Sequence, residues 1–184
     1  MIELIVVIVI LGILSAVALP RFTSIQRDAR IAKLNAARGA VQAASAMVHS
    51  VALVRGGAAD TAVCPGTTVI ANNSVAATGT VCTENGVVAT AFAYPASATA
   101  FAAAQPGILG AAGLHSVFSP TLAQLNADGY GAVVGATATI SVIGGTGTTG
   151  AVGAQTNATC SFTYRAPTVA NAAPVISAIT TTGC

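Results

Sequence analysis

The sequence has little charge and few aromatic residues. Asp, Glu, Lys and Arg make up 7% of its 184 residues, aromatic residues make up 4%, and Trp is absent. A soluble domain carries about 25% charged residues, so much of this surface must face protein, lipid or sugar instead of bare water. With no Trp, three Tyr and a basic cluster confined to residues 21–38, the part of the chain after residue 55 lacks the stacking and charge expected of a nucleic-acid-binding domain.

Catalytic motifs are missing as well. The chain contains no G-x-S-x-G, no H-E-x-x-H, no phosphate-binding loop and no pair of acids at a useful spacing. His115 stands alone, and Asn126 and Asp128 lack the further acids of a calcium loop. We therefore predict that the protein is not an enzyme and uses no metal or other cofactor.

Four cysteines lie in the low-charge part of the chain, namely Cys64, Cys82, Cys160 and Cys184. Without C-x-x-C spacing or paired histidines, they favour disulfides over zinc and indicate an oxidising compartment. Three pairings are open. We predict Cys64–Cys82 and Cys160–Cys184, because each closes a loop of about 20 residues and such closure stabilises by about 3 kcal/mol.

The chain begins with a continuous apolar run, Leu4–Leu19, which ends at Pro20. As a helix this run spans roughly 24 to 28 Å, close to the ~30 Å hydrocarbon core of a bilayer, so we interpret residues 1–20 as a membrane helix. Glu3 precedes the run and suits a helix N-terminus. Once the run is buried, however, its carboxylate needs a cation, and the terminal amine of this chain or of a neighbouring copy is the candidate.

After Pro20 the apolar positions recur every three or four residues, which predicts an amphipathic helix over residues 21–55. One apolar stripe comprises Phe22, Ile25, Ala29, Ala32, Ala36, Ala40, Ala43, Met47 and Val51, and a second line comprises Leu34, Val41 and Val48. Two apolar lines suit a helix that contacts its own domain on one side and neighbouring copies on another. The pair Gly56-Gly57 is a stop signal.

Most cations of the chain gather on this helix. They form a basic collar of Arg21, Arg27, Arg30, Lys33 and Arg38. Two interpretations stay open for the collar, a solvated helix face or a contact with anionic lipid headgroups.

Residues 56–184 are rich in Ala, Gly, Thr, Val and Ser, and predict a globular β-rich head. The predicted strands are Val87–Tyr94, Ala136–Ile143 and Thr159–Arg165, with a short helix at Pro120–Ala127 capped by Ser119 and a flexible loop at Gly144–Gly153. The expected fold class is thus α+β, a long N-terminal helix packed on a small antiparallel β domain. Asn72 and Asn157 match the N-glycosylation pattern, and glycans would mask an uncharged surface.

The first 55 residues carry a family likeness. The stretch IELIVVIVILGILSAVALPRF, followed by QRDARIAKLNAARGAVQAAS, resembles the N-terminal helix of type IV pilins. Within that family, PRF-xxx-Q-x-DAR looks most like the mannose-sensitive haemagglutinin pilins. The remainder matches only in general plan, as a cysteine-bearing β domain.

The resemblance implies the major subunit of an extracellular pilus that serves adhesion or motility. Such a subunit is held in the inner membrane as a precursor and is cleaved by a prepilin peptidase. The pilus assembly machinery then polymerises it with copies of itself into a helical filament, which binds a host or surface receptor. Glu3 would pair with the methylated terminal amine of an adjacent copy, and Gly12 and Pro20 would bound a segment that loses helical structure in the fibre.

Family members usually carry two more residues before the equivalent of Met1, so we expect the printed sequence to begin inside the mature protein. Two alternatives remain. One is a pseudopilin of a type II secretion system, which long extracellular filaments would exclude. The other is a membrane-anchored surface module that binds DNA or a sugar.

Overall fold

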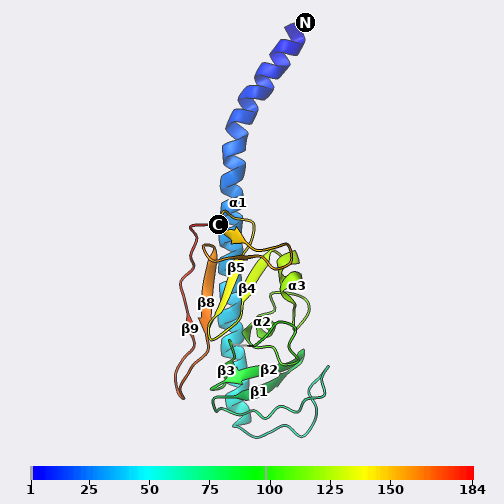
Figure 1. Ribbon diagram of the computed structural model, residues 1–184, viewed down its shortest axis with the longest axis vertical. Helices are drawn as coiled ribbons and strands as arrows, with labels where there is room; N and C mark the ends of the chain where they lie inside the picture. The colour runs from blue at the N-terminus through cyan, green and yellow to red at the C-terminus, as the bar shows by residue number, and fades with distance from the viewer. Residues whose placement is uncertain (1, 98) are drawn as a thin grey trace.

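The computed structural model describes residues 2–97 and 99–184, and it has the expected α+β class. One long helix, α1 (Ile2–Arg55), forms the spine of the molecule. Its second half packs against the residues that follow Gly56, which we call the head, and its first half extends beyond the head with a gentle curve (Figure 1). We call the end of the head where α1 emerges the exit end, and the opposite end the far end.

The helix stops where two glycines adopt left-handed backbone angles. Gly56 has a φ of 59° and Gly57 a φ of 78°, and the amide of Gly56 still donates to the carbonyl of Ala52 at 3.2 Å. Side chains with a Cβ are disfavoured at such angles, so glycine closes the helix at little cost. The predicted stop at this pair is confirmed.

The head contains three antiparallel sheets and two short helices. The first sheet has the order β1-β2-β3 and comprises β1 (Gly79–Thr83), β2 (Gly86–Ala91) and β3 (Tyr94–Pro95). The second has the order β4-β5-β8-β9 and comprises β4 (Tyr130–Val133), β5 (Ala138–Val142), β8 (Ser161–Arg165) and β9 (Val175–Ile176). The third pairs β6 (Thr148–Thr149) with β7 (Thr156–Asn157). The short helices are α2 (Ile108–Ala111) and α3 (Leu122–Ala127).

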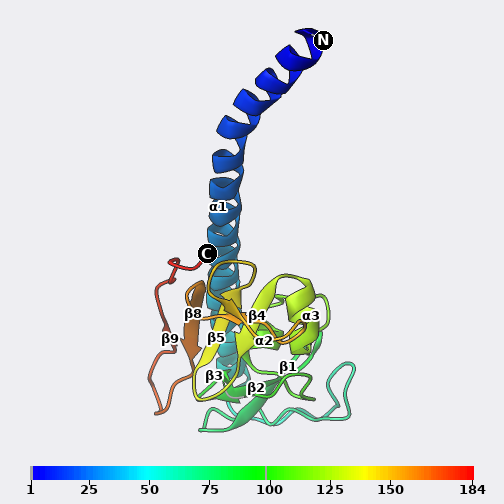
Figure 2. The ribbon, with the colours of Figure 1, turned by 45° about the horizontal axis from the view of Figure 1, so that its top comes forward.

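The main core lies between α1 and the second sheet, whose strands β5 and β8 run alongside the helix (Figures 1 and 2). The line Leu34, Val41 and Val48 faces the head and is buried. From β8, Phe162 and Tyr164 fill the facing side. The hydroxyl of Tyr164 donates to the carbonyl of Pro95 at 2.7 Å and so ties the two larger sheets together, and burial raises the pKa of this hydroxyl.

Side-chain alternation along β8 matches the predicted pattern on one face. Cys160, Phe162 and Tyr164 are buried, while Arg165 is exposed. Ser161 differs, because it is also buried and its hydroxyl donates to the carbonyl of Ala158 at 2.8 Å. Near its start the strand is also paired along its edge with the C-terminal segment, through an antiparallel bridge between Ser161 and Thr180.

Three local predictions need correction. The predicted strand Val87–Tyr94 is split into β2 and β3, because Phe92 and Ala93 adopt positive φ angles of 50° and 68°. The predicted loop Gly144–Gly153 contains β6, which pairs with β7.

The third correction concerns the cap of α3. Its cap is Thr121, which forms a reciprocal capping box with Gln124. The predicted cap, Ser119, instead donates its hydroxyl to the carbonyl of Ala103 at 2.7 Å.

Both disulfides have the predicted pairing. Cys64 is joined to Cys82 and Cys160 to Cys184. The first ties the loop after α1 to β1, and the second ties the C-terminal residue to the start of β8. Each bridge therefore fixes a segment that has little regular structure of its own.

The buried line on α1 should dominate the stability of the head. Leu34→Ala should lower the free energy of unfolding by about 3 kcal/mol, because it removes a fully buried side chain and leaves a cavity. Met47→Ala on the same helix is the control, since its side chain is 68% exposed, and should change stability by less than about 0.5 kcal/mol. Urea unfolding of the full chain in mild detergent, followed by circular dichroism, measures both. Equal losses in the two variants would contradict this account of the core.

Candidate interaction surface of the long helix

The first half of α1 exposes nearly all of its large apolar side chains. Between Ile2 and Ile25 these side chains are 48% to 79% exposed, and they comprise Ile2, Leu4, Ile5, Val6, Val7, Ile8, Val9, Ile10, Leu11, Ile13, Leu14, Val17, Phe22 and Ile25. Together they form an apolar surface on the order of 1,000 Å², where a monomeric protein exposes patches of at most a few hundred. A surface of this size indicates a site that other molecules cover.

The apolar run was interpreted above as a membrane helix. Within the part of the chain that the structure describes, no helix combines the length and the apolar content needed to cross a bilayer.

The second half of α1 separates the two apolar lines. Leu34, Val41 and Val48 are buried against the head, whereas Phe22, Ile25 and Met47 of the other stripe are more than half exposed. The small residues of that stripe, including Ala32, Ala36 and Ala43, are exposed as well, and so is Gly39 beside them. One face of α1 therefore holds the head, and most of the opposite apolar stripe is exposed, except that Ala40 and Val51 are half-buried.

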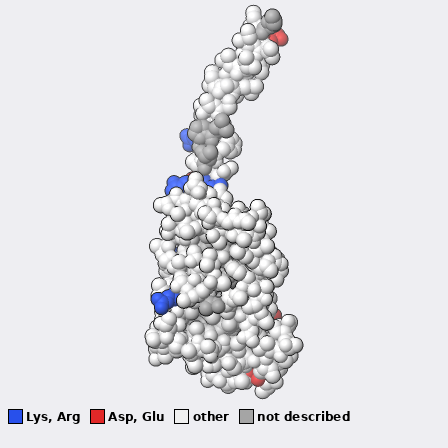
Figure 3. Space-filling model, in the orientation of Figure 1, with Lys and Arg blue, Asp and Glu red and all other residues white. Residues whose placement is uncertain are grey.

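Glu3 lies in the first turn of α1, is exposed, and has no ion-pair partner among the described residues. Figure 3 shows acidic atoms at this free tip and none along the rest of the protruding helix that is visible in the view. A lone carboxylate at the tip of an apolar surface becomes costly as soon as that surface is covered, unless a cation accompanies it.

The segment between Gly12 and Pro20 is helical in the single chain. The hydroxyl of Ser15 donates to the carbonyls of Leu11 at 2.6 Å and Gly12 at 3.1 Å, a bond within the helix that competes with its backbone ladder. A side chain at Gly12 would meet nothing within 4 Å. The side chain of Pro20 lies outside the described part of the chain. Loss of helix in this segment was predicted for the assembled fibre, so it stays a prediction.

Three of the five collar cations hold the head instead of facing solvent. Arg30 donates to the carbonyl of Cys184 at 2.6 Å, Arg38 donates to that of Ser177 at 2.9 Å, and Lys33 donates to that of Asp128. These contacts join the helix to the last strand, the C-terminal residue and the end of α3. Of the collar residues, Arg21 and Arg27 are exposed, whereas Arg30, Lys33 and Arg38 are half-buried. Both earlier interpretations of the collar therefore overlooked its main role, which is to attach the head.

Lys33 has a second partner on the head. Its ammonium lies 4.3 Å from the centre of the Tyr130 ring, a cation–π contact. Burial lowers the pKa of Lys33, partly offset by the nearby Asp128 carboxylate.

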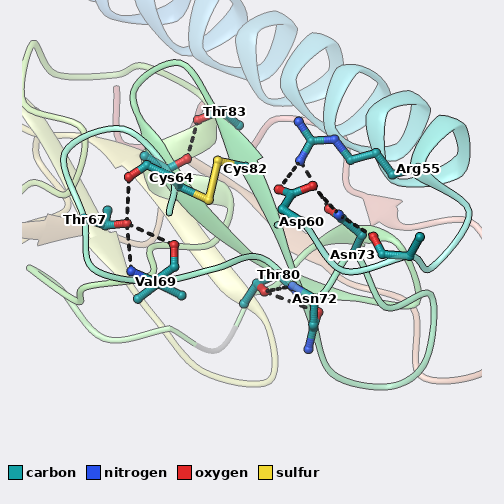
Figure 4. The surroundings of a disulfide bond; sticks show 12 residues. Arg55, Asp60, Cys64, Thr67, Val69, Asn72, Asn73, Thr80, Cys82 and Thr83 are labelled. Atoms are coloured by element: carbon teal, nitrogen blue, oxygen red, sulfur yellow. Dashed lines mark hydrogen bonds and ion pairs between the residues drawn. A yellow bond between two sulfur atoms is a disulfide. The ribbon is translucent and has the colours of Figure 1, made fainter. Parts of the chain in front are cut away.

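The far end of the head is anchored by a polar cluster at the end of α1 (Figure 4). Arg55 donates to a carboxylate oxygen of Asp60 at 2.9 Å, and the other oxygen accepts from Asn73 at 2.8 Å. Asn73 is fully buried with a φ of 49°, and its amide also donates to the carbonyl of Ala58 at 2.8 Å. The cluster fixes the turn after α1 beside the Cys64–Cys82 bridge.

The two glycosylation candidates differ in access. Asn72 is exposed. Asn157 is fully buried, and its amide nitrogen donates to the carbonyl of Gly183 at 3.1 Å, so the folded protein offers no room for a glycan there. The amides at Asn126 and Asn157 instead hold loops together, for example through the bond from Asn126 to the carbonyl of Gln155 at 3.0 Å.

Metal-binding chemistry finds little support. Among the described residues, the one group of nearby acidic and sulfur ligands is Asp60, Cys64 and Cys82. Both of its sulfur atoms are bound to each other in a disulfide, so neither is a thiolate. His115 accepts from the amide of Val117 at 2.9 Å and lies 3.7 Å from Asp128, a local contact in a turn.

Comparisons with known proteins give no relative for this chain. No protein-family model, no curated protein and no solved structure matches it. Arguments about function therefore depend on the residues and on their arrangement.

Removing one collar contact should loosen the head. Arg38→Met keeps the aliphatic stem but loses the bond to the Ser177 carbonyl, so it should lower the free energy of unfolding by about 1 kcal/mol. Arg21→Met is the matched control, because Arg21 is exposed on the protruding helix, and it should leave stability unchanged. Thermal unfolding of both variants in detergent measures the difference, and identical midpoints would rule out the attachment role.

Proposed function

We propose that this chain is the structural subunit of an extracellular filament of the type IV pilus kind, which polymerises through α1 and presents the head on the outside. The observation that carries the proposal is the exposed apolar half of α1, held outside the head on a helix of 54 residues. Other copies of the same chain are best suited to bury this apolar half, because each copy supplies both an exposed apolar half of α1 and an exposed stripe of small apolar residues.

The energetics support self-assembly. Covering one large apolar side chain is worth about 1.5 to 3 kcal/mol, and fourteen such side chains between Ile2 and Ile25 are at least 48% exposed. Even a fraction of that gain exceeds the cost of association, which is estimated at 4 to 15 kcal/mol. Exposed small residues such as Ala36 and Gly39 allow close approach of helices, so the packing can be dense.

Several further features fit a filament outside the cell. Two disulfides suit an oxidising environment. A head with few charges suits tight lateral contact or a glycan coat. The first 55 residues also resemble type IV pilins, and in that setting the subunit would be held at the inner membrane before assembly.

Glu3 gives the sharpest test. Glu3→Val should abolish filaments while the subunit still accumulates in the membrane fraction, because the carboxylate is needed to receive the terminal amine of an adjacent copy. Glu3→Gln keeps the shape and should fail likewise. Asp28→Asn is the matched control, an exposed acid on the same helix, and it should assemble normally. Electron microscopy of material sheared from cells that express each variant as their sole copy gives the answer.

Two results would refute the proposal. If the unaltered chain yields only monodisperse particles, the monomeric surface module is the better account. If Glu3→Val yields filaments of normal abundance, the carboxylate has no assembly role. Long filaments from the unaltered chain would also exclude a pseudopilin.

A further inference from the structure

The chain has few exposed charged side chains, and two of them lie near opposite ends of the head. Arg27 and Glu84 are both exposed, and neither has an ion-pair partner in the described part of the chain. Arg27 lies on α1 just beyond the exit end of the head, one turn before Arg30, which binds the Cys184 carbonyl. Glu84 lies in the turn between β1 and β2 at the far end.

Arg27 is on the side of α1 that carries the head. Seven residues make nearly two helical turns, so Arg27 shares a face with Leu34, which is fully buried against the head. Its side chain therefore leaves the helix on the side that carries the head, just beyond the exit end, and it is exposed.

Glu84 borders an apolar groove at the far end. The groove has a volume of about 580 Å³, and its lining includes Met47, Val51 and Arg55 of α1 together with Glu84. Glu84 is thus level with the last two turns of α1. From Arg27 to Val51 is 24 residues, or about 36 Å along a helix.

The head itself has nearly the same length. It covers α1 from Arg30 to Arg55, which is about 38 Å of helix. Two copies displaced along the helix axis by one head length therefore bring Arg27 of one copy level with Glu84 of the next. The distance along α1 from Arg27 to Val51 nearly equals the length of the head. The displacement that brings two heads into end-to-end contact therefore also brings Arg27 and Glu84 to the same height.

We propose that, in the filament, the exit end of one head contacts the far end of the next copy through an ion pair between Arg27 and Glu84. This contact rests on the filament proposed above and adds an axial spacing and a specific partner surface to it. The charge balance of the two ends agrees. At the exit end Arg21, Arg27, Arg30 and Lys33 outnumber Asp28 and Asp128, and at the far end Asp60 and Glu84 outnumber Arg55.

The visible distribution of charge follows the same division. Figure 3 shows basic atoms gathered where the helix leaves the head, a further basic group on the side of the head, and acidic atoms near the opposite end. Opposite signs at the two ends favour stacking in one direction and disfavour contact between like ends.

Helix packing fits the same displacement. A shift of 24 residues places Ile8 of one copy beside Ala32 of the next, and Gly12 beside Ala36. This next copy is a different neighbour from the one whose terminal amine meets Glu3, because that pairing requires two N-termini at nearly the same height. The apolar half of one copy then runs along the exposed apolar stripe of its neighbour, whose Ala32 and Ala36 are exposed. The helix of the first copy then lies on the side of its neighbour's helix that is away from the neighbour's head. The head-bearing face of the first copy, which carries Arg27, therefore points toward the groove and Glu84 of the neighbour.

Cross-linking tests the contact without removing the charge. In filaments of Arg27→Lys, a carbodiimide should condense the new amine with the carboxylate of Glu84 and convert subunits into a ladder of covalent oligomers. Peptide mapping should find position 27 joined to Glu84. Filaments of Arg165→Lys are the control, since Arg165 is an exposed cation on the head, and should give no link to Glu84. A ladder that maps only to other carboxylates overturns the proposal.

Charge exchange gives an independent readout. Arg27→Glu and Glu84→Lys should each lower filament yield by about fivefold, and the double variant should recover to within about twofold of the unaltered chain. Arg165→Glu should assemble normally. If the double variant is no better than the singles, or the singles assemble normally, the contact is wrong while the filament stands. If the unaltered chain forms no filament, the proposed function fails with it.

Discussion

Burial of one face of α1 under the head is the contact on which the rest of the molecule depends. Leu34, Val41 and Val48 supply the apolar part, at about 1.5 to 3 kcal/mol for each fully buried side chain. Arg30 and Arg38 add charged hydrogen bonds to carbonyls that would otherwise end in solvent. Because this face is occupied, most of the other apolar stripe is left exposed. The rotation of the head about α1 thus decides which surface remains for the proposed contacts with other copies.

The head compensates for short strands and few charges with buried side-chain amides. Asn73 comes from a loop, the half-buried Asn126 from α3 and Asn157 from β7, and each bonds backbone groups that lie elsewhere in the chain. A buried amide that satisfies several backbone groups stabilises irregular structure without adding charge. Two disulfides serve the same end. A nearly neutral head can therefore keep a defined shape, which a repeating assembly requires of every copy.

The sequence was sufficient for features that depend on long or local patterns. The extent of α1, its stop at Gly56 and the two disulfide pairings could all be predicted, because apolar periodicity, glycine and loop length report on them directly. It also indicated that α1 has two apolar lines. Which line holds the head could not be read from it, because both consist of similar residues and the choice depends on packing against strands far along the chain.

Other features could not be predicted from the sequence, because they too depend on contacts with distant parts of the chain. The roles of Arg30 and Lys33 depend on carbonyls more than 90 residues away, which no pattern on the helix reveals. Asn157 matches a glycosylation pattern, but it is buried and bonds to Gly183 in the C-terminal segment, which pairs alongside β8. The break between β2 and β3 follows from positive φ angles at Phe92 and Ala93, residues without a glycine's freedom.

The direction of the strands beside α1 has a mechanical consequence. Strands β5 and β8 run alongside the helix axis, and the contacts from Arg30 to Arg38 lie within a few turns of one another (Figure 1). Tension along the helix therefore loads the helix–head contacts in shear, so that they share the force and must break together. Tension across the helix would instead peel them apart one at a time. A head attached in this way resists pulling along the spine far better than pulling away from it.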